Sequence, residues 1–148
     1  MASESSKTGT GETTKSHSLV VQVETLLRVE FKDITSLLQG LVVESGVRSG
    51  ICHLFVPHTT AAILINENDD PALQRDLANF LKQLAPQDQV YHHSDGNCDA
   101  HLKAAVIGGT KTLLIENARL VLGRWQGVLF CEFDGPRRRD LRVKIISD

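Results

Sequence analysis

The C-terminal part of the chain contains four consecutive segments that read as β-strands. Their sequences are TKTLLIEN, ARLVLG, WQGVLFCEFDG and DLRVKIIS. Two further strand-like segments, ICHLFVP and TAAILINE, stand earlier in the chain, and apolar residues alternate with polar ones over residues 19–29, as in a half-buried strand. Strands in blocks with only a few helices between them indicate an α+β fold, a compact single domain of packed, largely antiparallel β-sheets.

Three segments have the helical period instead. An amphipathic stripe begins after Asp33, which is placed to cap a helix, and ends near Gly46. A second helix is expected from Asp70 and Pro71, with the aspartate at the cap and the proline at the first helical position. The segment AHLKAAVIG reads as a short third helix that a pair of glycines stops.

Length and charge exclude several classes of protein. At 148 residues, 41% hydrophobic and 23% charged, the chain suits one globular domain with a buried core. The net charge of −2 gives no general reason to expect binding to nucleic acid. No apolar run approaches the roughly 20 residues that a transmembrane helix needs. We therefore expect neither nucleic acid nor membrane as a partner.

The N-terminal segment differs from the rest in composition. Residues 1–17 are polar and lack the apolar region of a secretory signal, so we expect a disordered tail followed by a folded domain over residues 18–148. The cysteines are Cys52, Cys98 and Cys131, an odd number without CxxC spacing. This pattern favours a reduced, cytoplasmic location over secretion.

The stretch YHHSDGNCDAH, residues 91–101, holds three of the six histidines. Neutral imidazoles and carboxylates bind divalent metals, and the following helix start favours anions. The candidate groups are His93, Asp99 and His101. The alternative is a polar surface loop with SDGN as an ordinary turn, which explains those four residues but not the candidate groups. The four spaced ligands of a structural zinc site are missing.

Two more candidates stand at the ends of predicted strands. His58 follows Pro57, which ends a strand, so its side chain is expected at the rim of the sheet. A plain turn would explain the proline and the neighbouring threonines but not the histidine. Glu67 stands just before the second helix, whose cap does not need it, so a site carboxylate and a surface residue are equally open readings.

The last candidates come from the C-terminal strands. Trp125 stands between glycines that let a ligand or a neighbouring chain approach the backbone, although a lone tryptophan is more often a core residue. Three successive arginines, residues 137–139, follow a tight turn and offer forked donors suited to phosphate. The alternative for these arginines is a solvated hairpin turn.

Five short motifs follow in the order seen in the YjbQ-like family, which the chain resembles from about residue 18 to its C-terminus. The motifs are His58-Thr-Thr-Ala61, Tyr91-x-His93, Asn97-x-Asp99-Ala-His101-Leu-Lys103, Leu122-Gly-x-Trp-Gln126 and Glu132-x-Asp-Gly-Pro-Arg137. That family is often labelled secondary thiamine-phosphate synthase. The resemblance implies a compact α+β domain of packed β-sheets and a homotrimer with sites near the subunit boundaries.

The label implies a transferase that joins a pyrimidine pyrophosphate to a thiazole phosphate as a secondary activity, so a phosphorylated small molecule is the expected substrate. The implied catalytic groups are His58, Glu67, His93, Asp99 and His101, of which the three histidines would bind a divalent metal, zinc or magnesium. The implied pocket and phosphate-binding residues are Trp125, Gln126 and Arg137. The chain departs from the family pattern at Cys98 and at Arg124, where small or polar residues are common.

Two alternatives stay open at this point. One is a metal-dependent hydrolase of a small phosphorylated or heterocyclic metabolite, which would use the same histidines to activate water. The other is a non-catalytic trimeric protein whose histidines hold a structural metal. The sequence does not separate the transferase from the hydrolase, because both need phosphate donors and proton carriers.

Overall fold

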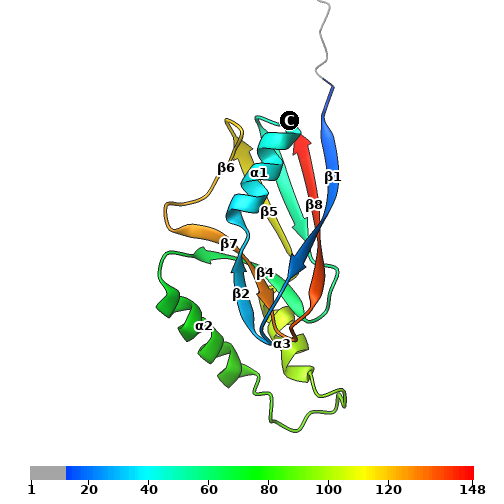
Figure 1. The fold of residues 1–148 in the computed structure, drawn as a ribbon, viewed down its shortest axis with the longest axis vertical. Helices are drawn as coiled ribbons and strands as arrows, with labels where there is room; N and C mark the ends of the chain where they lie inside the picture. Colours follow the sequence, from blue (N-terminus) through cyan, green and yellow to red (C-terminus); the bar gives the residue numbers. More distant parts are fainter. Residues whose placement is uncertain (1–12) are drawn as a thin grey trace, which may run out of the picture.

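The computed structural model describes residues 13–148, so most of the predicted tail lies outside the described residues (Figure 1). The strands in this part of the chain are β1 (Ser16–Glu24), β2 (Glu30–Asp33), β3 (Gly50–Phe55), β4 (Ala61–Glu67), β5 (Thr110–Glu116), β6 (Arg119–Leu120), β7 (Gln126–Glu132) and β8 (Arg138–Ser147). The helices are α1 (Thr35–Ser45), α2 (Pro71–Leu84) and α3 (Cys98–Ile107). None of these helices is both long enough and apolar enough to span a bilayer.

The strands form two antiparallel sheets. The larger sheet has the order β1-β8-β3-β5-β6, and the smaller one has the order β2-β7-β4. The last long strand, β8, is a central strand, because it pairs with β1 on one side and with β3 on the other. The α+β class and the antiparallel sheets predicted from the sequence are therefore confirmed.

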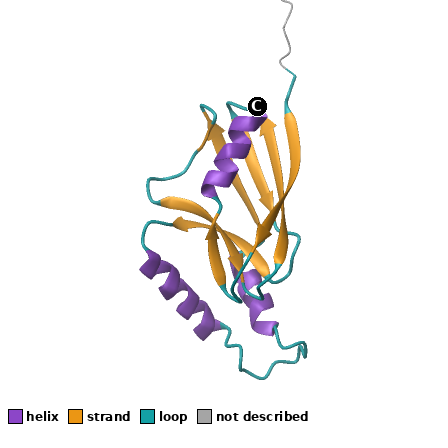
Figure 2. Cartoon of the chain, viewed as in Figure 1, coloured by secondary structure: helices purple, strands orange, loops and turns teal. Residues whose placement is uncertain are grey.

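The main core lies between the two sheets and under α1. Fully buried Leu38 and Val42 of α1 meet Leu54 and Ile145 of the larger sheet and Phe130 of the smaller one. Figure 2 shows α1 lying along the strands of the larger sheet, while α2 and α3 lie at the opposite end of the domain. This core explains why α1 buries one stripe and exposes the rest.

A second core covers the other face of the smaller sheet. Leu129 and Cys131 of β7 point away from the main core and pack with Leu81 of α2 and Ala100 of α3. The smaller sheet is therefore buried on both faces at its centre. This burial explains why β7 is almost continuously apolar, whereas the strands of the larger sheet alternate.

The helix boundaries follow from the residues at their ends. The side chain of Asp70 accepts a hydrogen bond from the backbone N–H of Ala72 at 2.9 Å, with Pro71 in the first turn, as predicted. Gly46 ends α1 in the left-handed conformation at φ 71°, also as predicted. The N-cap of α1 is Ile34 and not the predicted Asp33, although the side chain of Asp33 accepts a hydrogen bond from the N–H of Thr35, the first residue of the helix, at 2.9 Å.

The predicted strand over residues 19–29 is wrong at both ends. β1 begins at Ser16, two residues before the expected domain boundary, and ends at Glu24. The backbone N–H of Thr25 still donates to the carbonyl of Arg137 at 2.9 Å, in register with the β1–β8 pairs, but the N–H of Arg137 donates to the hydroxyl of Thr25 at 2.9 Å, which ends the ladder. The next residue, Leu26, is 77% exposed, so the alternation of apolar residues continues in sequence without a strand to bury them.

Candidate functional site

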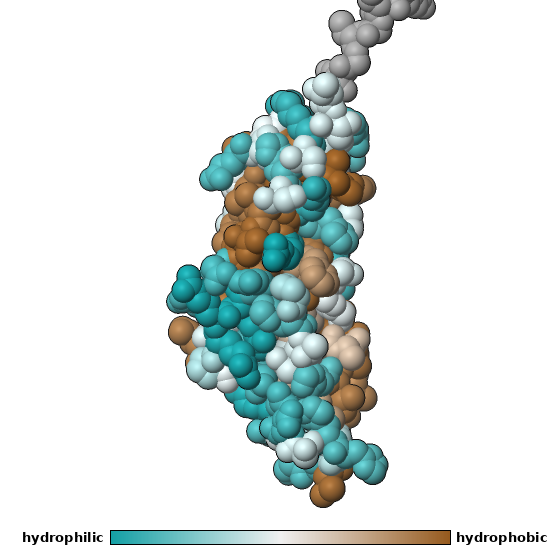
Figure 3. Space-filling view, turned by 90° about the vertical axis from the view of Figure 1, so that its right-hand side faces the viewer, coloured by the Kyte–Doolittle hydropathy of each residue, from teal (hydrophilic) through white to brown (hydrophobic). Residues whose placement is uncertain are grey.

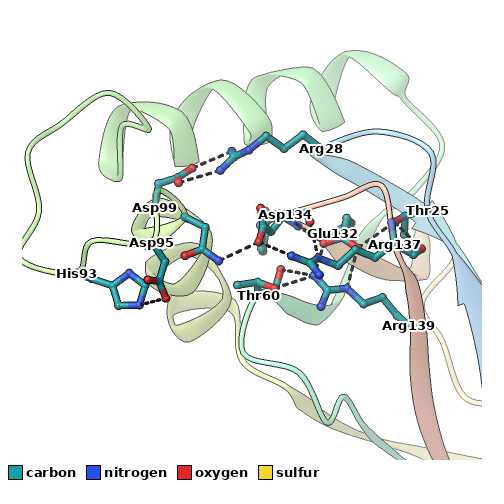
Figure 4. A network of polar contacts seen from close by, with 12 residues as sticks. Thr25, Arg28, Thr60, His93, Asp95, Asp99, Glu132, Asp134, Arg137 and Arg139 are labelled. Carbon is teal, nitrogen blue, oxygen red and sulfur yellow. Dashed lines mark hydrogen bonds and ion pairs between the residues drawn. The ribbon is translucent and has the colours of Figure 1, made fainter.

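An open pocket of about 740 Å³ lies between the β3–β4 link, the start of α3 and the β7–β8 link. Three segments that are far apart in the sequence therefore meet at one place. The lining residues are Phe55, Val56, Pro57, His58, Thr59, Thr60, Asn97, His101, Asp134, Arg137 and Arg139. Figure 4 shows the polar contacts that hold this region together.

A buried ion pair supports one wall of the pocket. Arg139 is only 5% exposed; its Nε donates to Glu132 Oε2 at 2.8 Å and its Nη2 to Oε1 at 2.5 Å. Nη2 also donates to the hydroxyl of Thr60 at 2.7 Å, and the hydroxyl of Thr25 donates to Glu132 at 2.9 Å. Burial opposes the charge of Glu132, but the hydrogen bonds from Arg139, from backbone and from Thr25 lower its pKa below the ordinary 4.5. The charged carboxylate therefore fixes Arg139 in the wall.

A second arginine stands at the mouth of the pocket. Arg137 has a side chain that is 52% exposed, and it donates from Nη2 to Asp134 Oδ2 at 3.0 Å. Asn97 Nδ2 donates to the same oxygen of Asp134 at 2.9 Å. Asp134 thus joins the β7–β8 link to the start of α3. Arg138, between the two lining arginines, pairs with Glu24 in the β1–β8 ladder and does not line the pocket.

His58 is held in a defined tautomer. Its Nε2 accepts a hydrogen bond from the backbone N–H of Asp140 at 2.9 Å. Burial and the nearby charge of Arg139 lower the pKa of His58 from its ordinary 6.5, so the ring is neutral at pH 7. A neutral ring that accepts at Nε2 carries its proton on Nδ1. His58 therefore brings an N–H donor to the lining.

The start of α3 contributes His101 and Asn97. The rings of His101 and His93 meet edge to face with their centroids 5.0 Å apart, but only His101 lines the pocket. His93 Nε2 lies 3.5 Å from the exposed carboxylate of Asp95. Asn97 Oδ1 is buried and has no hydrogen-bond partner within residues 13–148. An unsatisfied buried acceptor beside a pocket indicates that a donor from a ligand or water belongs there.

Asp99 lies outside the pocket. Its side chain is 1% exposed, and both oxygens accept from Arg28, each at 3.1 Å, while Lys103 donates to Oδ2 at 2.9 Å. Burial opposes its charge, but the hydrogen bonds from Arg28 and Lys103 outweigh burial and lower the pKa of Asp99 below the ordinary 3.8. The structure thus places this carboxylate in a salt-bridge cluster that ties α3 to the β1–β2 link.

Glu67, Trp125 and Gln126 lie at the other end of the smaller sheet. Glu67 is opposite Gln126 in the β4–β7 ladder, whereas the pocket end of the same ladder pairs Ala61 with Glu132. The two ends are six steps apart along the strand, a distance of about 20 Å at 3.3 Å per residue. Trp125 is 51% exposed and has the guanidinium of Arg124 4.8 Å above its ring. One chain therefore does not bring these predicted residues to the pocket.

The three histidines predicted to bind a metal do not form a ready-made metal site in one chain. Among residues 13–148, no group of three or more histidine, cysteine or acidic side chains could hold a metal ion. The Nε2 of His58 is occupied by the Asp140 amide, and His93 and His101 contact each other through their rings. Within one chain the described residues are therefore not arranged to hold a divalent metal, and we derive no step through one.

Sequence reasoning named the three arginines 137–139 together as phosphate donors but did not single out Arg139, and it gave Asn97 and Asp134 no role in a site although both stand in the quoted motifs. One signal was available for Arg139. Successive side chains of a strand point to opposite faces, so Arg137 and Arg139 share a side at the start of the last strand and Arg138 does not. No comparable local signal exists for Asp134, whose partner Asn97 lies 37 residues away in sequence.

Comparison with known proteins shows one consistent likeness. The family model described as "UPF0047 protein YjbQ-like" matches residues 20–148. A UPF0047 protein of Methanocaldococcus jannaschii is 47% identical over 127 residues, which cover 86% of this chain and 92% of that protein. YugU of Bacillus subtilis, also a UPF0047 protein, is 40% identical over 128 residues, which cover 86% and 97%.

Solved structures show the same likeness. A YjbQ/UPF0047 family protein of Clostridium acetobutylicum, described as uncharacterized, has a TM-score of 0.83 at 46% identity, over 86% of this chain and 98% of that one. A YbjQ-like protein of unknown function from Sulfolobus solfataricus has a TM-score of 0.88 at 33% identity, over 92% and 100%. The likeness in sequence and the likeness in fold therefore point to the same family and cover almost the whole described chain.

Proposed function

Because this chain belongs to the UPF0047 protein YjbQ-like family, we propose that its pocket is the site of a transferase of the thiamine-phosphate synthase type. Such an enzyme joins a pyrimidine pyrophosphate to a thiazole phosphate as a secondary activity. The observation that carries the proposal is the convergence of Arg137, Arg139 and His58 on one open pocket.

The arginines suit a phosphorylated substrate. A guanidinium donates two parallel hydrogen bonds to phosphate oxygens and keeps its charge at any physiological pH. Arg139 donates its Nε and Nη2 to Glu132 and so contributes a fixed positive charge, whereas Arg137 is half exposed and can follow the ligand. One rigid and one adaptable cation can hold a pyrophosphate as its negative charge increases on departure.

The proposed reaction needs few groups from the protein. The ring nitrogen of the thiazole attacks the exocyclic methylene carbon of the pyrimidine, a C–N bond forms, and the C–O bond to pyrophosphate breaks. The electron pair leaves with the pyrophosphate. His58, neutral and protonated on Nδ1, can donate a hydrogen bond to the leaving oxygen, and His101 lies in the same lining.

Both alternatives rely on histidines that bind a metal. The described chain contains no preformed group of three ligands, so no observation here favours the metal-dependent hydrolase or the structural-metal protein over the transferase. We further propose a cytoplasmic location, which is supported by the three cysteines being free thiols.

We also propose that the protein is a homotrimer. Val20 of β1 and Phe55 of β3 both lie opposite Arg142 on the outer face of the larger sheet and are 49% and 46% exposed. Figure 3 shows that apolar residues also reach the surface in the upper half of the side of the molecule that it draws. Exposed apolar groups of this kind favour self-association. A neighbouring chain would also explain how Trp125 and Glu67 can take part in a site.

The test compares two adjacent arginines. Arg137→Gln removes the exposed cation of the pocket, and Arg138→Gln removes a neighbour that does not line it. We expect Arg137→Gln to weaken the binding of inorganic pyrophosphate by about tenfold or more, as loss of a charged hydrogen bond does. Formation of thiamine phosphate from the two phosphorylated precursors should fall with it, while Arg138→Gln should match the wild type in both assays.

Each outcome has a distinct meaning. If pyrophosphate binds in the pocket but no thiamine phosphate forms, the pocket is an anion site but the proposed transferase activity is rejected. If Arg137→Gln and Arg138→Gln bind pyrophosphate equally, the pocket is not the phosphate site. Both assays should be run with and without a chelator, because an effect of the chelator would restore the metal-dependent alternatives.

A further inference from the structure

A second hollow, of about 250 Å³, lies between α2, α3 and the β1–β2 link, and it shares no lining residue with the candidate pocket. Its inner surface is apolar, because it includes the fully buried rings and side chains of Phe133 and Leu81. Ala78 of α2 also lines it. A methyl side chain at this position of the helix leaves the space that a larger residue would fill. We name this feature the α2–α3 hollow.

Three cations and no carboxylate line the α2–α3 hollow. Arg28 and Lys103 are both bonded to Asp99, which does not belong to the lining, and Lys82 stands exposed in the last turn of α2. Lys103 has a side chain that is only 5% exposed, and Asp99 accepts from one of its three N–H donors. Figure 4 shows Arg28 reaching across toward Asp99 at the start of α3, beside α2.

The local charge is unbalanced. Asp99 pairs with Arg28 and Lys103, and the charge of Asp134 also acts on Arg28, so the three cations outnumber these two carboxylates by one; Lys82 has no hydrogen bond or ion pair among residues 13–148. A cavity with an apolar inner surface and excess positive charge at its rim complements an anion that carries an apolar body. A free phosphate ion would gain nothing from the apolar lining, because it has no apolar surface to bury.

We propose that the α2–α3 hollow is a binding site for a small organic carboxylate, with its apolar body against Val29 and Ala78, over the buried Leu81 and Phe133, and its carboxylate among Arg28, Lys82 and Lys103. The volume is below the 300 Å³ or so at which pockets for drug-sized ligands begin, so the ligand is the size of a single ring or a short chain. A carboxylate there would share Arg28 and Lys103 with Asp99.

The test uses benzoate as the probe and benzamide as its uncharged counterpart. Each is titrated into the full-length, ¹⁵N-labelled protein while the backbone amide signals are followed. We expect benzoate to bind saturably and to shift the amides of α2 and α3, and benzamide to bind about fivefold or more weakly. Ala78→Leu should abolish benzoate binding, because leucine fills the hollow and is compatible with a helix.

Gln83→Leu is the matched control, since it adds the same side chain to an exposed position of α2 outside the lining. It should bind benzoate like the wild type. Lys82→Glu, at an exposed position, tests the charge without filling the hollow and should weaken benzoate about fivefold or more. Equal affinity for benzoate and benzamide, wild-type binding in both Ala78→Leu and Lys82→Glu, or shifts confined to the residues around His58 and Arg137 would each overturn the proposal.

Discussion

Glu132 and Arg139 join the two sheets through the interior of the protein. Glu132 ends β7 in the smaller sheet, and Arg139 is the second residue of β8 in the larger one. Arg139 donates to both carboxylate oxygens of Glu132, at 2.8 and 2.5 Å, and neither side chain is more than 6% exposed. The wall of the candidate pocket is therefore part of the connection between the sheets.

Breaking this pair should destabilise the protein strongly. Glu132→Gln leaves the guanidinium of Arg139 buried without its counter-charge, which costs about 3–5 kcal/mol in the free energy of unfolding. Urea unfolding followed by circular dichroism measures this loss. Arg138→Gln, on the exposed side of the same strand, should stay within about 0.5 kcal/mol of the wild type. A Glu132→Gln protein as stable as that control would show that the pair contributes little.

Asp99 should make the protein sensitive to acid. Its pKa is lowered in the folded state, so its contribution to stability is present above the ordinary 3.8 and is lost as pH falls through the folded value. Asp99→Asn should cost about 2–3 kcal/mol at neutral pH, and the difference from wild type should shrink at acid pH.

Melting temperatures measured from neutral pH to below 3.8 test this expectation. Asp95→Asn is the control, because the side chain of Asp95 is 76% exposed and its ion pair is with the exposed His93. It should melt like the wild type throughout. A constant difference between Asp99→Asn and wild type at every pH would mean that the carboxylate acts through shape and not through charge.

His58 should titrate below its ordinary 6.5, because burial and Arg139 disfavour its charged form. The unfolded chain then binds the proton more readily than the folded one, so stability falls as pH drops below 6.5. Replacing His58 by glutamine should reduce that dependence. An NMR titration of the imidazole protons gives the midpoint directly, and a midpoint at or above 6.5 would refute the expectation.

The role of the histidine-containing stretch, residues 91–101, can be tested with a matched pair of variants. His101 lines the pocket and His92 is an exposed residue that does not. His101→Ala should lower pyrophosphate binding and any synthase activity while folding and assembly are preserved, whereas His92→Ala should behave as wild type. If both variants kept full binding and activity, the loop would be only a polar turn.

The proposed trimer has a simple measurement. Light scattering on the purified protein should give about three times the 16.3 kDa chain mass. Phe55→Lys on the outer face of the larger sheet should shift the mass toward that of one chain, because it places a charge where the interface is proposed. If the wild-type protein is a monomer at micromolar concentration, the proposal that the site lies at a subunit boundary is rejected.

Local features of the fold were readable from the sequence. The start of α2 at Asp70 and Pro71 and the end of α1 at Gly46 depend on the residues at those positions and on their near neighbours. The end of β1 was not readable. The alternation continues past Thr25, and only the partner Arg137, 112 residues away, shows that the strand has ended.

For the candidate site, too, the residues in local motifs could be predicted, whereas roles that depend on distant partners could not. His58, His101 and Arg137 stand in local motifs and were predicted, and the pocket contains all three. Asp99 was predicted for the same reason, but its role depends on Arg28, 71 residues away, and no local period signals that partner. Residue types and spacing identify candidates, whereas long-range pairing decides which of them face a pocket.

The position of β8 has a consequence for how the protein is made. β8 follows all other described strands in the chain and lies between β1 and β3. During synthesis, Val21 of β1 therefore has no pairing partner until Leu141 of β8 has been made. A ribosome adds about 5–20 residues per second, which leaves β1 without its partner for on the order of ten seconds. Unpaired strands are prone to aggregate during that interval. We therefore expect the yield of folded protein in cells to depend on chaperones that shield β1 until β8 emerges.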